Sequence, residues 1–161
     1  MKKVVLSLLV AFFLVAIICC DGDDFPVSDI RLENFSNTGC KPVTRSSGSE
    51  GSYFELTATE GNMLYVKHVN AIFSCSSSSL GAKVEVDGNS ITISEYDMTN
   101  SGGIATTCDC PYDLGYEIGP LKDGVSYSII VITGWNKAIF DIVYSSTFTK
   151  VIVPSQADQG I

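Results

Sequence analysis

The stretch Cys108–Tyr127 has the sequence CDCPYDLGYEIGPLKDGVSY, and its pattern decides the fold class. From Tyr112 to Ile118, large apolar residues alternate with polar or small ones. Successive side chains of a β-strand point to opposite faces, so this alternation predicts a strand with one buried face. A turn is predicted from Gly119 to Gly124, with a second strand directly after it.

Further strands are predicted on both sides of this stretch, at the short, regular spacing typical of a sandwich or barrel. Met63–Phe73 is a long apolar strand region whose alternation slips at His68–Asn70, which indicates a bulge or a break. Asp87-Gly88 is a hairpin turn signal between two alternating runs. Tyr127–Thr133 is apolar on both faces, as in a central strand. No helical pattern longer than two turns competes, so an all-β domain is predicted.

The N-terminus has the layout of a secretory signal. Lys2 and Lys3 precede an apolar run, Val4–Ile18, that only Ser7 interrupts. The run is shorter than the roughly 20 residues that a membrane-spanning helix needs. We therefore predict a signal peptide over residues 1–19, with an uncleaved membrane anchor as the alternative.

Two cysteines close this run, and they carry a first resemblance. Ile17-Ile18-Cys19-Cys20 is similar to the lipobox of bacterial lipoproteins, in which aliphatic residues and one small residue precede the lipidated cysteine. Cys20 is the better candidate, because the small Cys19 precedes it, although Gly, Ala or Ser is usual there. The resemblance implies lipidation of Cys20 and attachment to a membrane. Loss of both cysteines with the signal is the alternative.

An acidic tract, Asp21-Gly22-Asp23-Asp24, follows Cys20. Its spacing does not match the twelve-residue loop that wraps calcium, so no metal site is predicted there. It resembles the acidic export signal that follows the lipidated cysteine in surface lipoproteins of Bacteroidetes-type bacteria. We therefore predict an acidic tether over residues 20–29, a sandwich domain over 30–154 and a C-terminal tail over 155–161.

Leu121, Gly124 and Tyr127 carry a second resemblance. Their spacing is similar to the tyrosine corner of immunoglobulin-like and fibronectin type III sandwiches, in which the tyrosine hydroxyl bonds to the backbone of the preceding turn. The antibody disulfide is not implied, because no cysteine lies two residues after Tyr127. Taken whole, the chain resembles immunoglobulin-like or fibronectin type III-like lipoproteins of Bacteroidetes-type bacteria. This implies an immunoglobulin-like antiparallel β-sandwich in the cell envelope, at the outer membrane or cell surface, and no chemistry to transfer.

Four cysteines remain after the signal, and they allow three pairings. A bond within the Cys108-Asp109-Cys110 pair would close a small, strained ring. Two pairings remain, and both join Cys40 and Cys75 to the C-x-C pair. Of these two we expect Cys75 to pair with Cys108 and Cys40 with Cys110. A four-cysteine zinc site is the rival interpretation, but C-x-C is not the usual C-x2-C spacing. A reactive thiol pair at C-x-C is also disfavoured, since no basic residue adjoins Cys108 or Cys110.

The charge balance excludes one class of partner. Without Lys2 and Lys3 the chain has eight basic and eighteen acidic residues, a net charge of −10. A surface of this sign repels phosphate backbones, so nucleic acid is not an expected partner.

The sequence shows no catalytic motif, so no enzyme activity, cofactor or metal is predicted. His68 is the only histidine, and a triad would need it beside a nucleophile and a carboxylate. We interpret His68 as a hydrogen-bonded strand residue. A small carboxylate-dependent hydrolase is the alternative function, and it would need two acids held in one cleft. Its candidates are Glu95, Asp97, Asp113 and Glu117.

Trp135 lies in a predicted turn, where it could contact a glycan or a protein, or else cap the core. The loops Ser76–Gly81 and Thr99–Thr107 are expected to carry a contact surface. The leading prediction is a lipid-anchored, non-catalytic surface domain for recognition or assembly. Its expected partners are the membrane, through the lipid, and a glycan or surface protein. A subunit of a fimbria or envelope complex is the third hypothesis.

Overall fold

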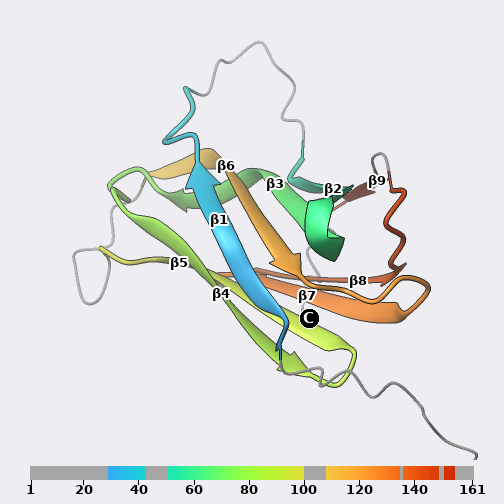
Figure 1. Cartoon of the computed structure of the whole chain (residues 1–161). Helices are drawn as coiled ribbons and strands as arrows, with labels where there is room; N and C mark the ends of the chain where they lie inside the picture. The colour runs from blue at the N-terminus through green and yellow to red at the C-terminus, as the bar shows by residue number, and fades with distance from the viewer. Residues whose placement is uncertain (1–28, 43–50, 100–107, 135, 149–150, 155–161) are drawn as a thin grey trace, which may run out of the picture.

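The computed structural model describes residues 29–42, 51–99, 108–134 and 136–148, and the backbone of 151–154. These residues form two packed β-sheets (Figure 1). Sheet A has the strand order β1-β6-β3-β2-β9, and sheet B has the order β4-β5-β7-β8. The strand bounds are β1 Arg31–Asn37, β2 Tyr53–Thr59, β3 Met63–Ser74, β4 Leu80–Asp87, β5 Ser90–Asp97, β6 Asp109–Gly119, β7 Ser126–Thr133, β8 Asn136–Val143 and β9 Val151–Pro154. A short 3-10 turn, η2, spans Glu60–Asn62 between β2 and β3.

The core lies between the two sheets and follows the alternation of the sequence. On β6, Tyr112, Leu114, Tyr116 and Ile118 are buried, and they face the buried side chains of β5 and β7. Pro111 does not break the register, since Cys110 is buried on the same face. The all-β sandwich predicted from the sequence is confirmed.

One strand pair differs from the expected antiparallel arrangement. β5 and β7 pair in parallel, with Ile91 opposite Ile129 and Ile93 opposite Val131. The chain leaves sheet B after β5, passes through β6 in sheet A, and returns beside β5 in the same direction. Sheet B is therefore mixed, and β7 is a central strand, as its apolar faces predicted.

The predicted tyrosine corner is present in the turn between β6 and β7. The backbone N–H of Lys122 donates a 2.9 Å hydrogen bond to the hydroxyl of Tyr127. Leu121 and Tyr127 are buried, and Gly124 has a φ of 77°, which favours glycine. The hydroxyl thus enters the core without leaving a polar atom unpaired.

The loop predicted over Ser76–Gly81 is shorter than expected. Leu80 and Gly81 belong to β4, and Leu80 packs into the core. The sequence predicted Leu80 and Gly81 to lie in the loop because the four serines before them carry no signal for the start of a strand. Most of the second predicted contact loop, Thr99–Thr107, lies outside the described residues.

Candidate functional site

The polar residues of interest gather where β3 departs from regular pairing with β6. The pairing register shifts between His68 and Ala71, and Asn70 has a φ of 60°. This is the predicted bulge, and asparagine tolerates the left-handed backbone better than most residues. His68 is buried in the sandwich, whereas Asn70 meets polar side chains on the outer face of sheet A.

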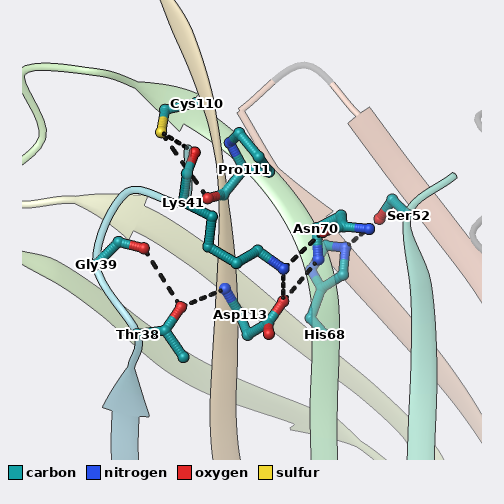
Figure 2. Close-up of polar contacts among 9 residues, drawn as sticks. All are labelled: Thr38, Gly39, Lys41, Ser52, His68, Asn70, Cys110, Pro111 and Asp113. Atoms are coloured by element: carbon teal, nitrogen blue, oxygen red, sulfur yellow. Dashed lines mark hydrogen bonds and ion pairs between the residues drawn. The ribbon is translucent and has the colours of Figure 1, made fainter. Parts of the chain in front are cut away.

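The outer cluster joins three segments of the chain (Figure 2). The Nζ of Lys41 lies 2.6 Å from Oδ1 of Asn70 and 2.6 Å from Oδ1 of Asp113. The backbone N–H of Asn70 donates a 3.0 Å hydrogen bond to the same oxygen of Asp113. The cluster therefore fastens the segment after β1 to the bulge of β3 and to β6.

Asp113 is held in its charged form. Partial burial disfavours the carboxylate, but hydrogen bonds from Lys41 and from the backbone N–H of Asn70 outweigh it. Together they hold the pKa of Asp113 below its usual value. An acid with a lowered pKa suits an ion pair and not a proton donor, so this cluster is structural.

The inner cluster centres on Glu95 of β5, which is 3% exposed between the sheets. His68 Nδ1 lies 2.7 Å from its Oε2. The hydroxyl of Thr133 donates to the same oxygen at 2.5 Å, and that of Tyr116 donates to Oε1 at 2.9 Å. These contacts link β3 and β6 of sheet A to β5 and β7 of sheet B, and they compensate the burial of a carboxylate.

Tyr116 remains a donor in this cluster. Burial and the neighbouring carboxylate of Glu95 raise the pKa of Tyr116 well above its usual value. Its hydroxyl therefore keeps its proton and donates a hydrogen bond to Glu95.

Ser52 is the last member of the inner cluster and the one nearest to solvent. Its Oγ lies 2.6 Å from Nε2 of His68 (Figure 2). The other ring nitrogen, Nδ1, is the one that contacts Glu95. Ser52 is partly exposed, whereas His68 is 4% exposed. The fold therefore places a hydroxyl, an imidazole and a carboxylate in series. The interpretation of His68 as a hydrogen-bonded strand residue is confirmed, but Ser52 was not predicted.

The candidate carboxylates of a hydrolase do not share one cleft. Glu95 lies inside the sandwich, whereas Asp113 and Glu117 alternate with the core residues of β6 and lie on the outer face of sheet A. Glu117 accepts a 2.8 Å hydrogen bond from Thr59. Asp97, at the end of β5, accepts one from the hydroxyl of Ser77. The geometry therefore does not favour catalysis by paired carboxylates.

The four described cysteines form the expected disulfides. Cys40 pairs with Cys110 and Cys75 with Cys108, at Cα–Cα distances of 5.6 and 5.5 Å. The sulfurs of Cys40, Cys75 and Cys110 lie within 4.8 Å of one another, so the C-x-C pair brings both bonds together. Zinc binds free thiolates, whereas each of the four sulfurs is already part of a disulfide bond. This disfavours the zinc alternative.

Two predicted site residues, Cys20 and Trp135, lie outside the described residues. In the part of the chain that the structure describes, no helix is long and apolar enough to cross a membrane.

Comparison with known proteins gives no relative for this chain: no protein-family model, curated protein or solved structure matches it. The functional proposals therefore depend on the residues themselves.

Proposed function

We propose that the domain acts in recognition or assembly at the bacterial cell surface, held to a membrane by lipid on Cys20. The observation that carries the proposal is a pair of exposed aliphatic side chains on β8, at one edge of sheet B in the described residues, with Asp141 between them on the same face. Ile139 and Val143 are 58% and 59% exposed on its outer face. Ile139 lies opposite the partly exposed Ile130 of β7.

A protein is the favoured partner for this surface. Aliphatic side chains gain from being covered by other apolar groups, whereas a sugar ring stacks on aromatic ones. The aromatic candidate for sugar binding, Trp135, is not among the described residues. Two disulfides and the cluster at Lys41 brace sheet A, so the domain meets a partner as a preformed body.

The position of β8 also supports assembly. Among the described strands, β8 pairs only with β7, so its other edge offers backbone donors and acceptors to an added strand. A subunit of a fimbria or envelope complex would use such an edge. This is the second form of the same proposal.

The test places a photo-crosslinking residue at position 139 and, as the control, at Lys83 on the opposite edge strand of sheet B. In living cells we expect one discrete protein adduct from position 139 and none from position 83. Val143→Asp should abolish that adduct and leave the melting temperature within about 2 °C, because Val143 is exposed.

No adduct from position 139, or equal adducts from both positions, would contradict the proposal. A glycan array run in parallel covers the carbohydrate alternative. If the Val143→Asp variant still bound a glycan, the glycan-binding site would lie outside the exposed face of β8.

A further inference from the structure

We propose that Ser52 is an activated nucleophile that takes the acyl group of small carboxylic esters, with His68 as its general base and Glu95 as the residue that orients the imidazole. The distances are 2.6 Å from Ser52 Oγ to His68 Nε2 and 2.7 Å from His68 Nδ1 to Glu95 Oε2. Both lie within the range for proton transfer between a nucleophile, its base and the orienting acid. The inference adds an activity to the proposed surface role and does not depend on it.

The hydrogen bonds to Glu95 fix which nitrogen of His68 carries a proton. As a carboxylate, Glu95 can only accept, and hydroxyl groups already donate to both of its oxygens. Nδ1 of His68 must therefore carry the proton that it shares with Oε2. In the neutral ring this leaves a lone pair on Nε2, which faces the hydroxyl of Ser52. The hydroxyl of Ser52 then donates a hydrogen bond to Nε2 of His68, which is the arrangement that activates a serine.

Packing holds the imidazole in that orientation. The ring of Phe54 stacks on His68 with centroids 4.2 Å apart and planes at 30°. Phe54 is buried and packs in turn against Phe140 of β8. A base whose rotamer is locked loses little entropy when it accepts a proton, and such preorganisation is a usual requirement of a catalytic group.

Exposure to solvent increases from Glu95 and His68 to Ser52, so the proposed nucleophile is the most exposed of the three residues. Glu95 and His68 are almost completely buried, whereas Ser52, directly before β2, is partly exposed. Ser52 is therefore the member of the three that lies nearest to solvent.

The reaction balances without any further reagent. Oγ of Ser52 bonds to the acyl carbon while its proton moves to Nε2 of His68. The bond from the acyl carbon to the alcohol oxygen then breaks, and the leaving alcohol takes that proton from Nε2. In the second half, water attacks the acyl carbon and gives a proton to Nε2. The bond from the acyl carbon to Oγ then breaks, Oγ takes the proton back from Nε2, and the acid is released. Glu95 keeps its charge throughout and stabilises the imidazolium that forms.

The test uses the purified full-length chain, a fluorophosphonate probe and p-nitrophenyl acetate. We expect one probe adduct per chain, located on Ser52 by peptide mass spectrometry, and hydrolysis of the ester. Ser52→Ala should lose both signals. Ser128→Ala, which removes a partly exposed serine from β7, should change neither. His68→Gln should slow labelling at least about 100-fold, the low end of what a general base contributes.

Thermal unfolding of each variant separates loss of chemistry from loss of the fold. Ser52→Ala leaves Nε2 of His68 without its hydrogen-bond partner, so we expect a lower melting temperature with a transition that stays cooperative. Labelling of the wild type at Ser52 no faster than at Ser128 would overturn the proposal, and so would unchanged labelling in a folded His68→Gln variant. Neither result would bear on the contact surface of β8.

Discussion

Replacement of both Cys40 and Cys110 by alanine is expected to lower the free energy of unfolding by about 4 kcal/mol. The bond closes a loop of sequence separation 70, and it is the loss of disorder in the unfolded chain that stabilises the fold. Cys110 is also buried in the core, so the replacement removes packing as well. Urea denaturation without reductant measures the change.

The second disulfide supplies the matched control. Cys75 and Cys108 have a sequence separation of 33, so this disulfide closes a shorter loop. From loop entropy alone, replacing both cysteines should lower the free energy of unfolding by about 0.7 kcal/mol less than replacing Cys40 and Cys110. A loss below about 1 kcal/mol for either pair would mean that the cysteines do not act as disulfides in the folded protein.

Glu95→Ala is expected to destabilise the fold by about 3–5 kcal/mol, the usual cost of removing one partner from a buried charged network. The substitution leaves Nδ1 of His68 and the hydroxyls of Tyr116 and Thr133 without their acceptor between the sheets. The free energy of unfolding in urea at neutral pH measures it.

Glu85→Ala on β4 is the control for loss of a carboxylate. Glu85 is exposed and pairs with Lys83 on the surface, so its removal should leave the free energy of unfolding almost unchanged. Equal effects at Glu85 and Glu95 would contradict the buried network between the sheets.

The sequence predicted the features that depend on local patterns. Alternation predicted β6, and the apolar faces of Tyr127–Thr133 predicted a central strand. The Tyr127 corner and the bulge beside His68 also form as predicted, because each depends on residues close together in the chain. The strain of a C-x-C ring excluded one disulfide pairing of three, and the expected one of the two that remained is the one that forms.

The inner cluster could not be predicted in the same way, because its members come from separate strands. Ser52 and His68 meet through the pairing of β2 with β3, and Glu95 reaches them from the opposite sheet. One signal was present: Glu95 continues the buried alternation of Ile91 and Ile93. A charge on an apolar face needs partners, but periodicity does not say which. The parallel pairing of β5 with β7 depends likewise on the chain crossing between sheets.

The most direct test of the proposed surface role is the intact mass of the protein isolated from its native cells, before and after reduction. The proposal predicts a chain that begins at Cys20 and carries acyl groups, with a gain of about four hydrogens when the two disulfides are reduced. A mass for the unlipidated or full-length chain would contradict anchoring through Cys20. No gain of mass on reduction would contradict the two disulfides, and the cysteines would then be free thiols or metal ligands.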